Sequence, residues 1–517
     1  MREAAALDLK RKKVIKPEYL FLYALMFLLY SPFAGIYSMS GMVGDTAIQL
    51  KLGLDDLAMG KLITDEIYSW HPDLVFTAHE SGWYLLLGIL YKLFKLWGII
   101  AIGTVFNYAT GCTVLSYTKN KAPVFFIALV MVLSLLLNGY PDYNVRPSVA
   151  SIFEITFLIV MFMNNWKSIH KAIAFAILGF FLAWLHGGML PLFCVIMVVF
   201  IILELLYRNY RDAIVLAIGL IAGFVLSLLN PLGFGCYSYA TLQSSATAAW
   251  AQIDEWHPVT LSLVQAVLIF LVFVGFMTND RIKRFEKTAV TELLMLCMFF
   301  IIMCVYKRFM SLFSVCYLIV APEQYYSLYK WIMNNVFKFK KEIKLHLSGM
   351  FYKVLAAACL LMIVVNGVLV VPAYLPTGTF YDVERMGAKD PEAAQFVLDH
   401  GYQRMFNTFN TGSWLVLRGV RVHIDNRVDP YISAFSGEDH ISEFMNCSTI
   451  ADMDVFAAKY DCDAFFLDMP DGYSYLLYEI ERYAPDRYRI VYDNVVESSI
   501  PEVGRMRYVI IECISPD

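Results

Sequence analysis

The sequence predicts a polytopic α-helical membrane protein that continues into a water-soluble C-terminal domain. Of the 517 residues, 59% are hydrophobic and 17% are charged, with a mean hydropathy of +0.57. This is more apolar surface than a soluble core of this length can bury. From Pro372 onward, 24 acidic residues outnumber 12 basic ones, a net charge of −12, whereas the preceding part carries +8. We therefore expect a transmembrane domain over 1–371 and a soluble α/β domain over 372–517.

The apolar residues form runs long enough for helices that cross about 30 Å of hydrocarbon. The segment from Trp83 to Lys95 is apolar but short and holds Lys92, so we expect an outer-leaflet or surface helix there rather than a span. We expect about eleven transmembrane helices, near 19–38, 97–117, 122–138, 148–163, 170–185, 189–207, 212–229, 260–277, 288–304, 309–331 and 351–371.

Basic residues indicate the orientation, because short cytoplasmic loops are enriched in Lys and Arg. A basic cluster, Lys10–Lys16, precedes the first span, and two further basic loops lie at Arg281–Lys287 and Lys338–Lys344. Placing all three in the cytoplasm gives a multi-pass protein of the cell membrane with a cytoplasmic N-terminus and an extracytoplasmic C-terminal domain. The loops 39–82 and 230–259 are then large and external.

Polar residues from separate loops fall on this predicted outer face, where an interfacial site can be assembled. Asp45 follows the first span, and flanking glycines leave the backbone free to present its carboxylate as a base or a metal ligand. Lys307 and Arg308 occupy a very short external turn, which indicates either a phosphate clamp or an interfacial anchor pair. The same face is expected to hold His79, Glu80, Arg146, His186 and Glu255.

These residues also have ordinary explanations. An Asp in a loop is usually solvated. His79 and Glu80 are adjacent, so on a helix their side chains would point in different directions. The two residues are therefore only a weak indication of a metal-binding site. The argument for a site rests on their convergence on one face rather than on any single residue.

Short mixed elements follow Pro372. We expect helices at 391–400, 452–460 and 473–482, and strands near 404–406, 422–424, 464–467, 489–492 and 507–512. Strands that alternate with helices are typical of a small α/β layer domain. Asp425 and Arg427 follow a predicted strand, where such folds often place ligands, although a charged turn explains them as well.

The order of these motifs resembles bacterial members of the GT-C superfamily of membrane glycosyltransferases, which includes oligosaccharyltransferases and protein mannosyltransferases. The C-terminal stretches Thr411–Leu415 and His423–Tyr431, together with Asn407, are similar to Gly-Tyr-Leu and Asp-Gly-Arg stretches of some members. In the membrane part, the motifs are Gly44-Asp45, His79-Glu80, Arg146-Pro147, Leu185-His186-Gly187, Asn230–Gly233, Glu255-Trp256 and Lys307-Arg308.

This resemblance implies a GT-C-like fold and transfer of a sugar, with inversion, from a polyprenyl-phosphate-linked donor to an extracytoplasmic acceptor. It makes Asp45 the catalytic base or metal-orienting acid. The donor phosphate would lie against Arg146, Lys307 and Arg308, with His79, Glu80, His186 and Glu255 in support.

The expected partners are the lipid-linked donor and membrane lipid. Nothing in the charge distribution indicates a nucleic acid, and no protein partner is identified. Many family members carry Asp-x-Asp in an early loop, whereas this chain has only the adjacent Asp55-Asp56. The identity of any cofactor is therefore undetermined, and a divalent metal ion is the candidate.

Two other functions fit the same helices. A lipid or solute transporter or flippase would need ionisable groups within the spans, and Glu154 and Glu323 do fall in apolar runs. A catalytically inactive protein of GT-C fold could instead serve as a scaffold. Neither the sugar nor the acceptor can be read from the sequence.

Overall fold

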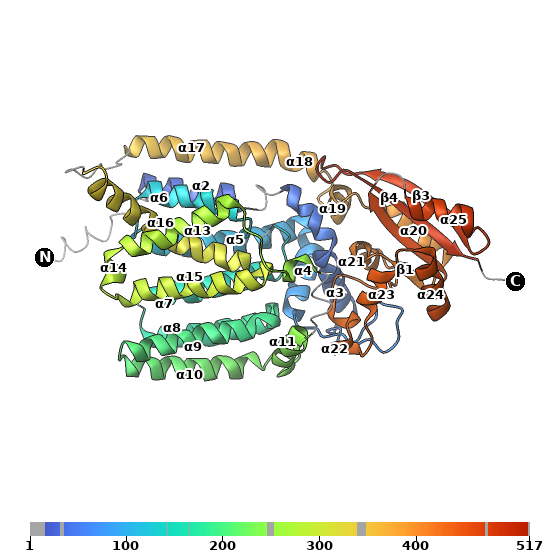
Figure 1. The fold of residues 1–517 in the computed structure, drawn as a ribbon, viewed down its shortest axis with the longest axis horizontal. Helices are drawn as coiled ribbons and strands as arrows, with labels where there is room; N and C mark the ends of the chain where they lie inside the picture. The colour runs from blue at the N-terminus through green and yellow to red at the C-terminus, as the bar shows by residue number, and fades with distance from the viewer. Residues whose placement is uncertain are drawn as a thin grey trace.

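Apolar helices pack side by side into an elongated bundle, and the C-terminal segment covers one end of it (Figure 1). The computed structural model describes residues 16–31, 36–141, 143–164, 166–245, 253–338, 348–470 and 474–514. The basic cluster at Lys10–Lys13 and most of the predicted basic loop at Lys338–Lys344 lie outside these ranges.

Helices of two lengths make up the bundle. Six helical segments are long and apolar enough to cross a membrane: α5 (Leu96–Thr118), α8 (Ser168–Leu185), η3 with α9 (Gly187–Met189, Leu190–Leu206), α10 (Tyr210–Ser227), α15 (Lys287–Val305) and α17 with η6 and α18 (Gly349–Val365, Asn366–Val370, Val371–Tyr374). Five apolar helices are shorter: α2 (Pro17–Tyr30), α4 (Ser81–Phe94), α6 with η2 (Val124–Ser134, Leu135–Leu137), α7 (Ser148–Met163) and α13 (Leu263–Thr278). A short helix, α14 (Asp280–Lys283), follows α13, and α16 (Met310–Asn335) completes the bundle. The total of eleven spans stays a prediction.

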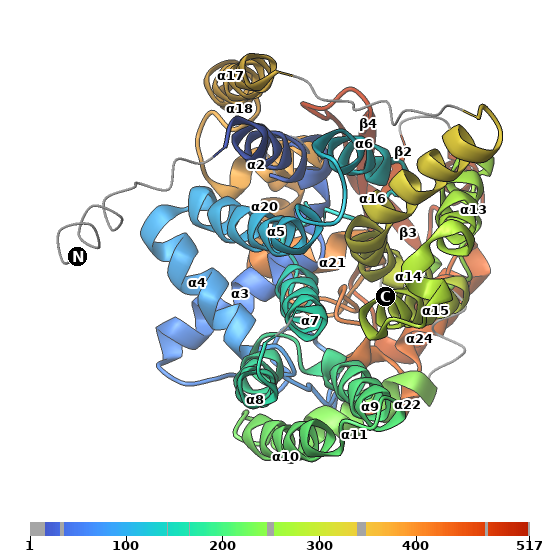
Figure 2. The same ribbon diagram turned by 90° about the vertical axis from the view of Figure 1, so that its left-hand side faces the viewer.

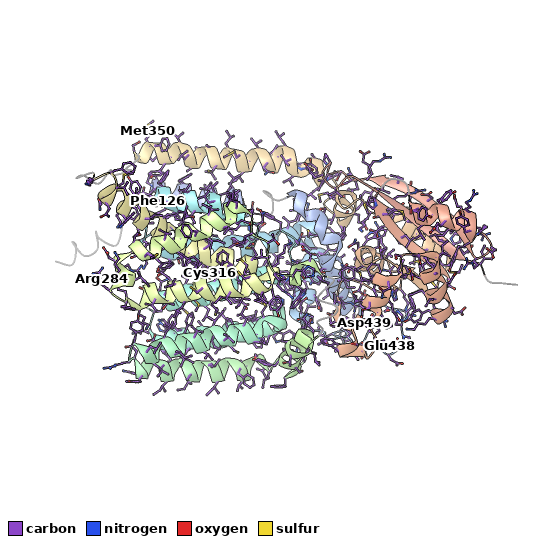
Figure 3. All side chains as sticks on the ribbon, viewed as in Figure 1. Phe126, Arg284, Cys316, Met350, Glu438 and Asp439 are labelled. Carbon is purple, nitrogen blue, oxygen red and sulfur yellow. The ribbon has the colours of Figure 1, made fainter. Side chains whose placement is uncertain are left out.

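Helix α7 lies at the centre of the bundle, with α5, α8, α9 and α15 around it in the end-on view of Figure 2. Nearly all of its side chains are buried, as its predominantly apolar sequence requires. By contrast, α17 lies at the rim against α2, and its Met350 points outward in Figure 3. The start of α7 is therefore well placed to carry side chains into the middle of one end of the bundle.

Arg284 marks the opposite end of the bundle from the C-terminal sheet (Figure 3). It belongs to the basic loop 281–287, so the longest described basic loop and the acidic C-terminal segment lie at opposite ends. This arrangement is what the predicted topology requires. Which end faces the cytoplasm stays a prediction.

Two closely packed helices lie at the end of the bundle that faces the C-terminal segment (Figure 1). After η1 (Ile36–Val43), α3 (Asp45–Met59) crosses α4 at a pair of glycines. A Cβ atom on Gly53 would lie 1.8 Å from the carbonyl oxygen of Tyr84, so only glycine permits this approach. The prediction that Asp45 lies in a loop is thus wrong, because the residue is the first of a helix.

The C-terminal segment contains a four-stranded sheet with the order β1-β2-β4-β3. Strands β1 (Met405–Asn407) and β2 (Ala464–Pro470) are parallel, whereas β4 (Arg505–Cys513) is antiparallel to both β2 and β3 (Tyr488–Glu497). The described helices of this part are α19 (Phe380–Met386), α20 (Pro391–His400), α21 (Phe409–Leu417), η7 (Asp429–Tyr431), α22 (Ser433–Ser436), α23 (His440–Asn446), α24 (Ile450–Tyr460) and α25 (Tyr475–Tyr483).

The strand predicted near 422–424 is wrong. Val422 makes only a single bridge, to Ser69 of the first large loop, and this contact joins the loop to the C-terminal segment. The other predicted strands are found. Helix α20 is also found as predicted: the Asp390 side chain accepts hydrogen bonds at its start, and Gly401 ends it with a φ of 70°.

Candidate active site

A cavity of about 920 Å³ lies at the end of the bundle that faces α3 and the C-terminal segment. One part of its wall is apolar and includes Leu135, Ile152 and Leu312. The cavity brings together seven of the residues that the sequence singles out: Asp45, Glu80, Arg146, His186, Glu255, Lys307 and Arg308. They come from six separate segments of the chain, so the predicted convergence is present in the structure.

An ion pair joins Asp45 to Arg146. Asp45 begins α3, and Arg146 lies just before α7; the guanidinium Nη1 is 3.1 Å from Asp45 Oδ2 and 3.6 Å from Glu255 Oε2. About a third of each side chain is exposed, toward the cavity. Burial raises the pKa of Asp45, Arg146 partly offsets this effect, and Glu255 adds to it. The site therefore places a carboxylate with an elevated pKa next to a fixed cation.

A second cluster surrounds Glu80, which directly precedes α4. Its Oε1 lies 3.5 Å from His79 Nε2 and 3.7 Å from His186 Nε2, and Gln49 Nε2 donates to its Oε2 over 3.0 Å. On the far side of His186, Nδ1 lies 2.9 Å from Ser151 Oγ of α7. These contacts link α3, α4, α7 and the end of α8 across the floor of the cavity.

The charges in this cluster are set by burial and by neighbours. Burial alone would raise the pKa of Glu80, but its interactions, those with His79 foremost, outweigh burial and lower the pKa. Burial lowers the pKa of His186 to about 4, so its imidazole is neutral near pH 7. For His79, burial is opposed by Glu80 and by Asp429, which raise the pKa to about 9. Glu80 is therefore ionised and His79 is an imidazolium at neutral pH.

Lys307 and Arg308 lie in η5 (Lys307–Phe309), which packs against η4 (Asp254–Trp256). Lys307 forms an ion pair with Asp254, and Arg308 lies 4.3 Å above the ring of Trp256. The two basic residues thus hold loop 230–259 against the turn, and both also line the cavity.

A smaller cavity of about 390 Å³ adjoins the first and shares Glu80, His186 and Arg308 with it. Its wall includes His79 and Tyr239, whose rings stack with centroids 4.0 Å apart, and Tyr239 belongs to α11 (Gly235–Ser245). Trp256 and Tyr306 contribute further aromatic surface. The two cavities therefore meet at the Glu80 cluster.

Asp425 and Arg427 do not line either cavity. Arg427 is 5% exposed and donates to Asp425 over 2.6 Å and to Glu66 of the first large loop over 2.5 Å. Tyr431 also donates to Asp425, over 2.7 Å. These residues form a buried network between loop 39–82 and the C-terminal segment. The charged turn that the sequence predicts therefore joins these two segments and does not line a cavity.

The adjacent acids Asp55 and Asp56 also lie away from the cavities. Asp55 accepts from Tyr68 and Lys51, and Asp56 accepts from the backbone of Ile63. They stabilise the second half of α3 and the chain after it, and are not among the lining residues.

In the C-terminal segment, Glu438, His440 and Glu443 present ligand atoms within 4.8 Å of one another. Lys459 forms ion pairs with both glutamates, and thus offsets part of the negative charge of this group.

Three residues of the site were missed in the sequence analysis. Gln49 lies one helical turn after Asp45, so helical spacing could have found it. Ser151 lies one turn into α7 on the cavity side. Asp429 had no local signal, because it acts on the pKa of His79 from a segment some 350 residues further along the chain.

The comparisons with known proteins establish the fold. No protein-family model and no curated protein matches the chain. Among solved structures, the chain is similar to the Archaeoglobus fulgidus oligosaccharyltransferase in the apo form, with a TM-score of 0.52, 12% identity, and coverage of 82% of this chain and 66% of the archaeal one. The oligosaccharyltransferase AglB from Archaeoglobus fulgidus, in complex with an inhibitory peptide and a dolichol-phosphate, matches with a TM-score of 0.51 and 12% identity over 85% of this chain and 66% of the other.

Cupriavidus metallidurans ArnT bound to undecaprenyl phosphate matches with a TM-score of 0.44 and 12% identity over 95% of this chain and 96% of the other. The present chain spans just under two thirds of the length of the archaeal protein. The archaeal matches show that the chain shares the fold of this oligosaccharyltransferase, and six of its described helical segments are long and apolar enough to cross a membrane.

Proposed function

We propose that the protein is a membrane glycosyltransferase that moves a sugar from a polyprenyl-phosphate-linked donor to an extracytoplasmic acceptor. The observation that carries the proposal is the Asp45–Arg146 pair in a large cavity with one apolar wall at the end of the bundle. A carboxylate can accept a proton from the acceptor, and the cation can bind the phosphate that leaves.

The donor is assigned to the larger cavity. Its apolar wall suits an isoprenoid chain, and Arg146, Lys307 and Arg308 supply positive charge for a phosphate. AglB, which shares the fold, is solved with a dolichol-phosphate, a lipid of the same chemical class. We expect Arg146 to turn from Asp45 toward the phosphate when the donor binds.

The acceptor is assigned to the smaller cavity, which opens onto the same Glu80 cluster. The acceptor's hydroxyl or amide attacks the anomeric carbon from the face opposite to the phosphate, so that the configuration inverts. Its proton passes to Asp45, the bond between the anomeric carbon and the phosphate oxygen breaks, and the polyprenyl phosphate leaves against Arg146. Glu80, His79 and His186 hold the groups around this point in place.

A divalent metal ion fits the residues of the cavity. Asp45 and Glu255 are carboxylates that both face Arg146, and Mg²⁺ is commonly held by one or two carboxylates together with substrate phosphates. An ion held there would neutralise charge on the leaving phosphate. The steps above depend on the side chains alone.

We also propose the finer topology: eleven spans, a cytoplasmic N-terminus, and an α/β domain on the outer side. Cysteine substitutions at the exposed Asp399 and at Arg284, labelled in intact cells by a reagent that does not cross membranes, test this orientation. Labelling at 399 and protection at 284 is the expected pattern, and the reverse pattern would contradict it.

The function is tested by incubating the purified full-length protein in lipid nanodiscs with a panel of polyprenyl-phosphate sugars and candidate acceptors. Release of free polyprenyl phosphate from at least one donor, measured by chromatography, is the expected result. No consumption of any donor, with the protein folded by its thermal unfolding profile, would favour a transporter or an inactive scaffold.

A further inference from the structure

Both nitrogens of the His186 imidazole face a polar group, and the ring lies where the two cavities meet. Its Nε2 lies 3.7 Å from Glu80 Oε1, and its Nδ1 lies 2.9 Å from Ser151 Oγ. Because the ionised Glu80 can only accept, Nε2 carries a proton. In the neutral ring Nδ1 is then the acceptor, and the Ser151 hydroxyl donates to it.

The Ser151 hydroxyl has a second acceptor within reach. Its Oγ also lies 3.0 Å from the carbonyl oxygen of Ser148, one helical turn earlier in α7. A hydroxyl has one proton, so it donates to only one of the two acceptors at a time. If His186 gains a proton at Nδ1, the ring can donate to Oγ while the hydroxyl donates to Ser148. At Nδ1, both charge states of His186 thus keep a hydrogen-bond partner.

The neighbours of His186 decide which charge state is present. Burial, and then the cations Arg308, His79 and Arg146, favour the neutral ring, whereas Glu80 favours the charged one. Arg146, just before α7, and Arg308, in η5, line the larger cavity together with His186 and are the groups assigned to the donor phosphate. A phosphate bound to the two guanidinium groups would offset their effect and add a negative charge beside the ring.

We propose that His186 takes up a proton when the phosphate of the donor binds in the larger cavity, and that Ser151 is the positioning residue that accommodates this proton. The Ser151 hydroxyl turns from Nδ1 to the carbonyl oxygen of Ser148. The cavity wall thereby gains a positive charge that faces the phosphate. This proposal rests on the assignment of the donor to the larger cavity, whereas its measurements need no sugar transfer.

The proton uptake has a defined pH dependence. The pKa of His186 without ligand is about 4. Nearby charges shift a pKa by about 1–3 units, so a rise of about two units would bring the pKa of the bound form to about 6. The bound form then holds the proton more tightly than the free form. Binding of the donor should therefore strengthen as the pH falls from about 7 to about 5, by up to about ten-fold per pH unit.

The test uses the full-length protein in phosphatidylcholine nanodiscs and polyprenyl methyl phosphate, a phosphodiester with no sugar to transfer and no group that titrates in this range. Isothermal titration calorimetry at about pH 5.5, in two buffers that differ in their enthalpy of ionisation, gives the number of protons taken up. The wild type should take up about half a proton or more per bound ligand, and His186→Gln clearly fewer. Asp45 lies beside the same phosphate, so a proton that it takes up appears in both proteins and cancels in the difference.

Substitutions of Ser151 separate its role from a general structural one. Ser151→Ala leaves the Nδ1 proton without its acceptor and should lower the pKa of the bound His186 by about one unit, which reduces the uptake. Ser151→Thr keeps a hydroxyl and should restore it. Ser227→Ala is the matched control, because Ser227 Oγ likewise lies 2.7 Å from the carbonyl oxygen three positions earlier and 2.8 Å from the hydroxyl of Tyr237, and Ser227 lines neither cavity.

Equal proton uptake in the wild type and in His186→Gln would overturn the proposal, and so would a wild type that does not bind polyprenyl methyl phosphate. If the variants do not fold, ¹⁵N NMR of the histidine-labelled wild type, with and without the ligand, decides alone. One imidazole should change from neutral to doubly protonated when the ligand binds. No change in any imidazole would contradict the uptake.

The two proposals can fail separately. Proton uptake at His186 in a wild type that consumes no sugar donor would remove the proposed function and leave the response to the phosphate intact. Sugar transfer by a wild type whose proton uptake equals that of His186→Gln would do the opposite.

Discussion

Arg146 Nη1 lies 3.1 Å from Asp45 Oδ2, although 101 positions separate the two residues in the sequence. Arg146 is placed by the end of the central helix α7, and Asp45 by the start of α3, which lies at the end of the bundle that faces the C-terminal segment. The pair therefore depends on how these two layers pack.

Arg146→Ala should weaken binding of polyprenyl phosphate by about ten-fold or more, because a charge-assisted hydrogen bond to the phosphate is lost. Arg146→Lys keeps the charge but loses the forked geometry, so its loss should be smaller. Titration of the protein in nanodiscs with fluorescent polyprenyl phosphate measures both. Arg404→Ala, on the exposed surface, is the control. Unchanged affinity in Arg146→Ala would contradict the donor assignment.

Gly53→Ala should destabilise the protein by about 1–3 kcal/mol or more, because the new methyl group overlaps the backbone of α4. Gly367 is the matched control, since a Cβ there meets no atom within 4 Å. Thermal unfolding in detergent compares Gly53→Ala with Gly367→Ala. Equal melting temperatures for the two variants would show that α3 and α4 do not cross as closely as described.

Arg427→Met should cost about 3–5 kcal/mol of unfolding free energy, because it leaves Asp425 and Glu66 buried without their cation. The exposed pair of Arg404 and Asp461 offers a comparison, and Arg404→Met should cost less than about 1 kcal/mol. Denaturant unfolding, with limited proteolysis of loop 39–82, reports the difference. Similar small losses in both variants would argue against a buried attachment of this loop to the C-terminal segment.

A histidine cluster joins the same two segments. His71 Nε2 lies 2.7 Å from His423 Nδ1, and the His71 ring stacks on His440 at 3.9 Å. Burial, and then the charge on His440, lowers the pKa of His71 to about 3, while Glu443 and Lys459 also act on it. The unfolded chain therefore binds more protons than the folded one between about pH 6.5 and 3.

Stability should consequently be complete above pH 6.5 and should fall as the pH drops below it, by up to about 1.4 kcal/mol per pH unit for each such histidine. His71→Phe removes one titrating group and should flatten this slope. Melting temperatures between pH 7.5 and 4.5 measure it, in the wild type and in the variant. A slope that His71→Phe leaves unchanged would assign the pH dependence to other groups.

The parts of the fold that the sequence predicts well are those set by local pattern. The predicted range 148–163 coincides with α7 because its residues are predominantly apolar and a proline precedes it. Helix α20 is signalled by Asp390, Pro391 and Gly401. By contrast, the sequence of α3 shows no clear helical pattern, because it mixes polar and apolar residues and the helix is stabilised by packing on α4.

In the site, as in the fold, some features can be predicted from the sequence and others depend on packing. The convergence of Asp45, Arg146, His186 and Glu255 could be expected from topology, since each lies at the predicted outer end of a span or in an outer loop. The electrostatic effect of Asp429 on His79 could not, because it depends on how the C-terminal segment packs against the first large loop. The strand expected at 422–424 failed for a related reason, since Val422 bridges Ser69 instead of joining the sheet.

The most direct test of the proposed function is the turnover of Asp45→Asn, measured as polyprenyl phosphate released from a donor that the wild type consumes. Loss of the base should lower the rate by about 100-fold or more while donor binding is retained. Asp55→Asn, on the same helix and away from the cavities, should keep a rate near that of the wild type. A rate for Asp45→Asn equal to that of Asp55→Asn would contradict the assignment of Asp45 as the catalytic base.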